Sequence, residues 1–158
     1  MIPSGLVARL RSSAAPASPA PSTKTGTRPP GSTRWAPNTD SLPYRGTSAG
    51  GGYSTVEDLA RFAHALLSHK LLGPDTTKLL ITGKVKAGPG ARYAYGFEDA
   101  RDAHGDGWVG HGGGAPGMNG DLKIYPKSGY VVAVLANLDP PAAQRISEYL
   151  DPRLSTER

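Results

Sequence analysis

The chain has 158 residues, a length that fits one domain of ordinary size. It contains no cysteine, which excludes disulfide frameworks, thiolate zinc sites and cysteine nucleophiles. Hydrophobic residues make up 37%, and the 21 glycines and 15 prolines indicate that part of the chain is unstructured. The net charge of +5, if it were spread over the whole chain, would favour an anionic partner.

The positive charge is confined to the N-terminal segment. Residues 1–39 hold five bases and no acid, so residues 40–158 carry equal numbers of each. We therefore predict a disordered tail rich in Ala, Pro, Ser and Arg over 1–39 and a partial folded domain over 40–158. Five bases with Trp35 as the tail's only aromatic are too sparse to predict a nucleic-acid partner. A linker, an organelle transit sequence and an unselected reading of GC-rich DNA all remain possible origins of the tail.

Nothing in the sequence predicts insertion into a membrane. The longest apolar run is Tyr130 to Ala136, far short of the roughly 18 residues that a spanning helix needs. The N-terminus lacks the hydrophobic core of a secretory signal. We expect no membrane-spanning segment and no signal peptide, and the localisation stays open.

Two helices are predicted in the first half of the folded part. Ser54 and Glu57 form a capping-box pattern, and apolar residues recur after it at helical spacing, which predicts a helix over 55–70. Gly73 and Pro74 end it. A second, short helix is predicted over 75–81.

Beyond Gly90 the apolar period changes to two, which predicts strands. Tyr93, Tyr95 and Phe97 are expected along one strand face, and short strands are expected at 108–111 and around 122–124. Residues 125–129 are typical of a hairpin loop.

The last two predicted elements are a strand and a helix. The run 130–136 is apolar on both faces, which favours an interior strand covered above and below. Asp139 as cap and Pro140 as first helical residue predict a final helix to about residue 150. The expected fold class is α+β, an antiparallel sheet of three to four strands covered by helices.

The glycine-rich segment around residue 112 matches a nucleotide-binding fingerprint only superficially. Gly112, Gly114 and Gly117 satisfy GxGxxG, but that motif needs a following helix, and Pro116 and the strand pattern after it argue against one. We predict no cofactor. The sequence also has no histidine spacing typical of a metal site, so no metal is expected.

An α/β-hydrolase esterase is an alternative interpretation of the glycines. His111 to Gly114 spells HGGG, and Gly46 to Gly50 matches GxSxG with Ser48 as the candidate nucleophile. The two motifs occur in the reverse of the usual order, and no buried strand precedes Ser48 in the sequence. A plain loop before a capped helix accounts for these residues better.

The segments 49–62, 93–97 and 110–137 together resemble the C-terminal part of the serine β-lactamase and DD-peptidase-like family, in its class C and esterase-type branch. The resemblance covers about residues 40–152. It implies the C-terminal lobe of a β-lactamase/transpeptidase-like fold. It also implies acyl-enzyme hydrolysis of a β-lactam, a D-Ala peptide or an ester in the intact family.

By this resemblance His111, Gly112 and Gly113 fill the family's KTG or HxG strand motif. Glycine there lets a substrate approach the strand closely, and the histidine orients the substrate or its leaving group. Gly114 would offer its amide to the oxyanion. The alternative is that the glycines from 112 to 117 form only a flexible turn.

Two other family motifs are missing from the sequence. No serine has a lysine three residues on, and no asparagine has a tyrosine or serine two residues before it. We therefore predict a catalytically incompetent fragment, which would take a small-molecule or peptide substrate only if a missing lobe completed the site. The alternative is a non-catalytic module that binds a peptide or ligand along the strand edge near 110–117.

Overall fold

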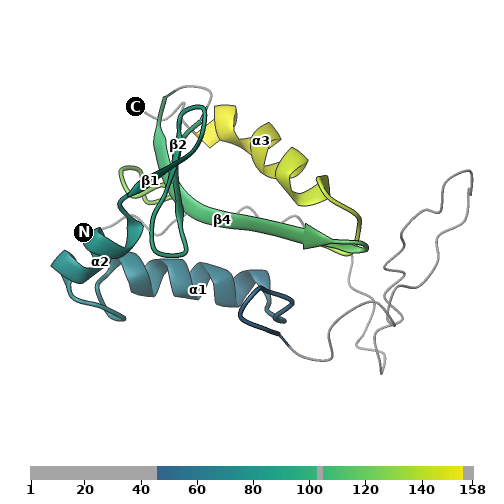
Figure 1. Ribbon diagram of the computed structural model, residues 1–158, viewed down its shortest axis with the longest axis horizontal. Coiled ribbons are helices and arrows are strands. Elements are labelled where there is room, and N and C mark those ends of the chain that lie inside the picture. The colour runs from purple at the N-terminus through teal and green to yellow at the C-terminus, as the bar shows by residue number, and fades with distance from the viewer. Residues whose placement is uncertain (1–45, 103–104, 155–158) are drawn as a thin grey trace, which may run out of the picture.

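The computed structural model describes residues 46–102 and 105–154, which form an antiparallel sheet with helices on both faces (Figure 1). The six described strands are hydrogen-bonded in sequence order, each antiparallel to the next. The helices are α1 (Val56–Leu67), α2 (Pro74–Ile81) and α3 (Ala142–Leu154). The strands are β1 (Val85–Gly88), β2 (Ala91–Tyr93), β3 (Glu98–Arg101), β4 (Gly107–Ala115), β5 (Met118–Ile124) and β6 (Val131–Ala136). The predicted α+β class is confirmed, with six strands where three or four were expected.

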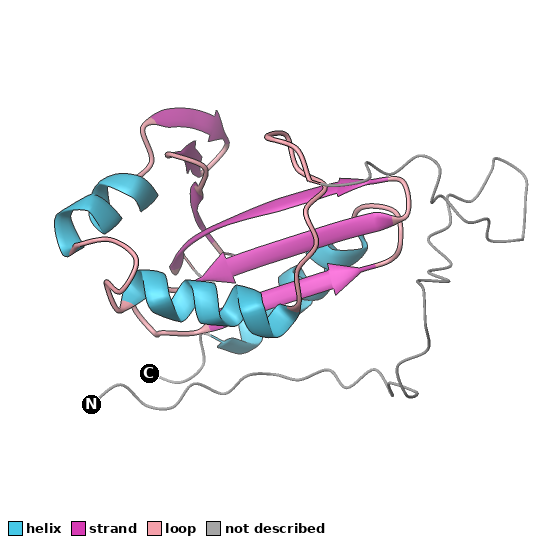
Figure 2. Cartoon of the chain, turned by 90° about the horizontal axis from the view of Figure 1, so that it is seen from below, coloured by secondary structure: helices cyan, strands magenta, loops and turns pink. Residues whose placement is uncertain are grey.

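The sheet carries a different kind of side chain on each face. In Figure 2 its three long strands lie side by side, with a helix in front of them and another behind. The face toward α1 is apolar, and its buried cluster consists of Ala63, Leu66, Phe97, Val109 and Ile124. On β5 the alternate residues Asn119, Asp121 and Lys123 are also buried, and each is hydrogen-bonded to a residue of α3. The sheet is therefore held to α1 by apolar packing and to α3 largely by polar contacts.

The cap of α1 lies one residue later than predicted, and the helix begins at Val56. Thr55, not Ser54, has the extended backbone of a cap residue, and its hydroxyl accepts from the Asp58 amide at 3.1 Å. Ser54 donates instead to the Thr55 carbonyl. Because Thr55 and Asp58 repeat the same three-residue spacing, the pattern located the helix but not its first residue.

The aromatic residues from 93 to 97 do not lie on one strand, which corrects the prediction. β2 ends at Tyr93 and β3 begins at Glu98, and a tight turn joins them. The Ala94 amide donates to the Phe97 carbonyl at 2.7 Å, and Gly96 has φ 80°. A positive φ at Gly96 reverses the chain there, so Tyr95 sits at the tip of the turn and is 60% exposed.

The apolar strand β6 is covered on both faces but is not interior. Among the described strands it pairs with β5 alone and forms one margin of the sheet. Contacts with α1 on one face and α3 on the other explain why its sequence is apolar throughout. The loop before β6 matches its prediction, with Gly129 at φ 80° and the Tyr125 amide donating to the Tyr130 carbonyl.

The start of α3 is capped by a residue of another element. The helix begins at Ala142, and the Ala143 amide donates to the side-chain oxygen of Asn119 on β5 at 2.7 Å. Asp139, the predicted cap, accepts from the Gly117 amide at 2.6 Å instead. Asp139 therefore ties the β4–β5 turn to the segment before α3.

Candidate functional site

The predicted site residues all lie on the part of β4 that extends beyond its neighbour. β3 pairs with residues 107–110 of β4, whereas β5 pairs with it from Val109 to Ala115. In the described part of the chain, residues 111–115 therefore have a strand on one side only. The histidine and the following glycines lie on this open strand edge, where an extended ligand can add its own backbone hydrogen bonds.

The three glycines of the edge face two different environments. An added Cβ at Gly112 would lie 2.9 Å from Asp121 Oδ1 and 3.0 Å from Gln144 Nε2, and one at Gly114 would lie 2.5 Å from Pro140 Cγ. A Cβ at Gly113 would meet nothing within 4 Å. Packing against the α3 side thus accounts for Gly112 and Gly114, whereas Gly113 borders open space.

These glycines are not a flexible turn. They belong to β4 and pair residue by residue with β5. Only Pro116 and Gly117, which has φ 70°, form the connecting turn. Because β4 continues directly into β5, no helix follows the glycines, and this agrees with the rejection of the nucleotide fingerprint.

His111 is exposed and both its ring nitrogens have partners. Nε2 lies 2.9 Å from the Tyr93 hydroxyl, and Nδ1 lies 2.6 Å from the Gly112 carbonyl oxygen. The two rings also meet edge to face, with centroids 5.6 Å apart. The alternating aromatic residues predict a strand at Tyr93 but not this contact, since Tyr93 and His111 lie 18 residues apart and on strands separated by β3.

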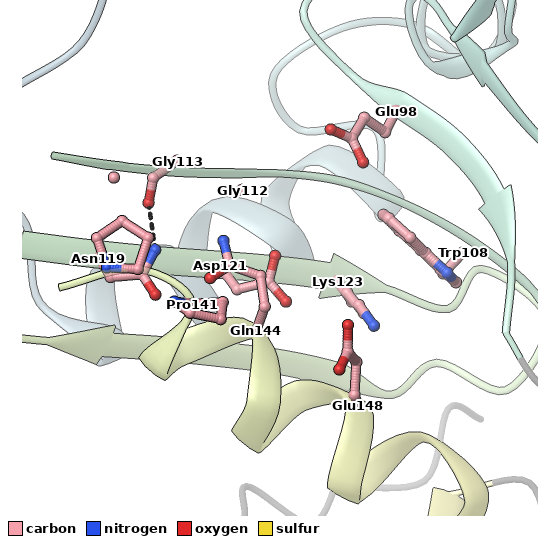
Figure 3. Close-up of a pocket in the computed structure, with 12 residues that line it drawn as sticks. Glu98, Trp108, Gly112, Gly113, Asn119, Asp121, Lys123, Pro141, Gln144 and Glu148 are labelled. Atoms are coloured by element: carbon pink, nitrogen blue, oxygen red, sulfur yellow. Dashed lines mark hydrogen bonds between the residues drawn. The ribbon is translucent and has the colours of Figure 1, made fainter. Parts of the chain in front are cut away.

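A cavity of about 510 Å³ lies on the α3 side of the glycines (Figure 3). Its floor is the β4–β5 pair, and Figure 3 shows Gln144 and Glu148 projecting from α3 toward Asp121 and Lys123. The full lining is Glu98, Trp108, Gly112, Gly113, Gly114, Asn119, Asp121, Lys123, Pro140, Pro141, Gln144 and Glu148. The cavity does not include His111. No sequence pattern predicts this cavity, because one of its walls is α3, which begins 28 residues after Gly114.

A buried ion pair and a buried carboxyl lie beside this cavity. The Lys123 ammonium donates to Asp151 at 2.6 Å and lies 5.0 Å from the centre of the Trp108 ring, and the Tyr125 hydroxyl donates to the other Asp151 oxygen at 2.6 Å. Burial is the main cause that raises the pKa of the Tyr125 phenol, and the hydrogen bond to Asp151 raises it further. Burial raises the pKa of the Asp121 carboxyl, although hydrogen bonding from Ser147 and the charge of Lys123 oppose that rise.

No serine of the described residues is arranged as an activated nucleophile. None has its hydroxyl hydrogen-bonded to a histidine or lysine side chain. Ser147, the most buried, has its hydroxyl within hydrogen-bond distance of the Asp121 carboxyl and of the Ala143 carbonyl, and of no histidine or lysine. Within the same residues no group of three histidine or acidic side chains converges as a metal site. No helix in this part of the chain is long and apolar enough to cross a membrane.

The α/β-hydrolase alternative is wrong. Ser48 lies in an exposed turn closed by two hydrogen bonds between the backbones of Thr47 and Gly50, at 2.7 and 3.1 Å. The HGGG segment is a strand rather than a loop, and every strand pair described is antiparallel. A nucleophile elbow needs a strand-to-helix turn at the end of a strand in an α/β-hydrolase sheet.

Comparisons with known proteins identify the family. The Beta-lactamase family model matches residues 7–154, a range that reaches into the segment before residue 40. A penicillin binding protein from Bacillus halodurans matches with 31% identity and a TM-score of 0.59, over 66% of this chain and 33% of that one. A D-stereospecific amidohydrolase from Streptomyces sp. matches in fold, with 24% identity and a TM-score of 0.53, over 60% and 28% of the two chains.

The chain thus spans about a third of the length of these solved structures. No curated protein sequence matches it. The family model covers nearly all of the sequence, and it agrees with the resemblance carried by the capped helix and the His-Gly strand. This chain belongs to the beta-lactamase family.

Proposed function

We propose that this chain supplies one wall of the acyl-transfer site of a serine hydrolase. The observation that carries the proposal is the overhang of β4, because the strand loses its β3 neighbour at the residue where the His-Gly segment begins. The open edge at residues 111–115 binds the acyl part of the substrate as an added strand.

Each residue of the edge has its own role in this proposal. His111 orients the substrate or its leaving group, and Gly112 and Gly113 form the surface along which the substrate lies. The open space over Gly113 supports this close approach. The amide of Gly114 is one of the two donors of the oxyanion hole.

We infer that the 158 residues are catalytically incompetent on their own. They contain no Ser-x-x-Lys and no Tyr-x-Asn or Ser-x-Asn, so the nucleophile, its base and the second oxyanion donor must come from another lobe. Two matched structures are named for penicillin binding and for D-stereospecific amide hydrolysis. β-Lactams and D-amino-acid amides are therefore the first substrates to test, followed by esters.

Two preparations test the proposal. The chain alone should hydrolyse nitrocefin and p-nitrophenyl esters no faster than the buffer does. A chimera, in which residues 46–154 replace the matching part of the Bacillus halodurans penicillin binding protein, should be acylated by a fluorescent penicillin. Hydrolysis by the chain alone that disappears in His111→Ala would overturn the inferred incompetence.

The oxyanion role is tested in the chimera by a matched pair of substitutions. Gly114→Pro and Gly114→Ala both add a Cβ against Pro140, but only proline removes the amide hydrogen. Acylation by the proline variant should be slower than by the alanine variant by a factor of about 10² to 10³. Equal rates in two folded variants would exclude Gly114 as an oxyanion donor.

A non-catalytic peptide-binding module is the second candidate, because the same open edge can pair with a peptide without turnover. Titration of the ¹⁵N-labelled chain with a D-Ala-D-Ala peptide separates the two functions. Saturable shifts at residues 111–115, together with a chimera that folds but is not acylated, would favour the module.

A further inference from the structure

The hydroxyl of Tyr93 lies 2.9 Å from Nε2 of His111. Tyr93 is the last residue of β2 and is partly buried, whereas the histidine is exposed on β4. The edge-to-face contact of the two rings adds a second constraint, so the imidazole is held by both a hydrogen bond and packing.

The partners of the two ring nitrogens determine the tautomer of His111. Nδ1 lies 2.6 Å from the Gly112 carbonyl oxygen, which can only accept a hydrogen bond. Nδ1 of the neutral ring must therefore carry the hydrogen, which leaves Nε2 as an acceptor. The Tyr93 hydroxyl, which can donate, is then the donor to Nε2.

We propose that Tyr93 is a positioning residue for His111. It fixes the imidazole as the neutral Nδ1–H tautomer and holds the ring at the open edge of β4. While its hydroxyl donates a hydrogen bond to Nε2, the Tyr93 oxygen retains lone pairs that can accept from an N–H or O–H of a ligand. This inference rests on the proposed function, since it assigns the polar group at the edge to the Tyr93–His111 pair rather than to the histidine alone.

The neighbouring tyrosine offers a matched control. Tyr95 lies two residues further along the same hairpin, is 60% exposed, and contacts Lys84 rather than His111. Tyr93→Phe and Tyr95→Phe each remove one hydroxyl and keep the ring. Only the first removes the donor to Nε2.

The proposal is tested by long-range ¹H–¹⁵N spectra of the histidine side chains in the full chain, recorded at a pH where the imidazole rings are neutral. In the unmodified chain His111 should have a protonated Nδ1 and an unprotonated, hydrogen-bonded Nε2, unlike the exposed His64. In Tyr93→Phe the Nε2 resonance should move to the position of a nitrogen without a donor, and Tyr95→Phe should leave it unchanged.

Two results would overturn the proposal: an Nε2–H tautomer of His111 in the unmodified chain, or an Nε2 resonance that Tyr93→Phe leaves in place. The first needs no variant, so the proposal can be tested even if Tyr93→Phe does not fold. Neither measurement depends on turnover. If the chimera is not acylated but the His111 spectrum is as expected, the proposed function fails. The inference about the Tyr93–His111 pair would then still stand.

Discussion

At the scale of single residues, the glycines of β4 separate into those required by packing and those that are free. Gly110 is the most constrained, because an added Cβ would lie 1.8 Å from the Leu122 carbonyl oxygen, which is backbone and cannot move aside. Gly113 is the least constrained. A glycine count in the sequence cannot distinguish them, since the distinction depends on which neighbour lies across each position.

Gly110→Ala should therefore destabilise the chain, and Gly113→Ala should not. We expect Gly110→Ala to lower the free energy of unfolding by at least about 1 to 3 kcal/mol, because the added Cβ would push β5 away from β4. The second should stay within about 0.5 kcal/mol of the unmodified chain. Urea denaturation followed by circular dichroism measures both, and equal losses would contradict the assignment of the clash to Gly110.

Asp121 should give the stability a pH dependence of known sign. Burial raises its pKa in the folded state above the ordinary value of about 4, so the folded state binds the proton more tightly than the unfolded state. The stability that Asp121 contributes is complete below pH 4 and is lost as the pH rises through the raised pKa.

Asp121→Asn keeps an oxygen that can accept from Ser147 and removes this titration. The free energy of unfolding of Asp121→Asn, relative to the unmodified chain, should increase as the pH is raised from 4 to 7. Urea denaturation at several pH values measures the difference. A difference that is flat or decreases over this range would contradict the raised pKa.

At the scale of elements, local patterns predicted the three helices and the strands β4, β5 and β6. Two errors are local, the cap of α1 at Thr55 and the turn at Gly96, whereas the others arise where a distant residue decides. The capped helix near residue 56, the loop at 125–129 and the apolar strand after it all follow from short-range spacing. The cap of α3 does not, because it is supplied by Asn119, 24 residues before Ala143. Tyr93 and His111 likewise meet only through the pairing of β2, β3 and β4.

The contact between β5 and α3 rests on a buried ion pair. The side chains of Lys123 and Asp151 are each 8% exposed. Lys123→Met should lower the free energy of unfolding by about 3 to 5 kcal/mol, because it leaves the Asp151 carboxylate buried without a cation.

The exposed pair of Arg61 and Asp58 on α1 is the control, since its side chains are 77% and 54% exposed. Arg61→Met should cost at most about 0.5 kcal/mol. Adding Asp151→Asn to Lys123→Met should restore part of the loss, since it removes the unpaired charge. A loss in Lys123→Met no larger than in Arg61→Met would show that the pair does not hold α3 to the sheet.

At the scale of the whole molecule, the two margins of the sheet differ. β1 is short and exposed, whereas β6 is six residues long, apolar, and covered by helices on both faces. In the part of the chain that the structure describes, the outer backbone groups of β6 have no strand partner. A long, apolar and unpaired strand is a site for pairing with another chain.

We therefore expect the purified chain to self-associate through β6, by antiparallel pairing of two copies around a two-fold axis. Leu135 on β6 is 45% exposed, and Leu135→Lys should shift the chain toward monomer because each copy would bring a charge into the apolar strand pair. Leu71, 51% exposed and outside the sheet, provides the control in Leu71→Lys. Sedimentation velocity over a range of concentrations measures the association. A chain that is monomeric at every concentration would exclude the association. A Leu71→Lys variant that dissociates as fully as Leu135→Lys would place the association outside β6, because only Leu135 lies on the strand that the pairing requires.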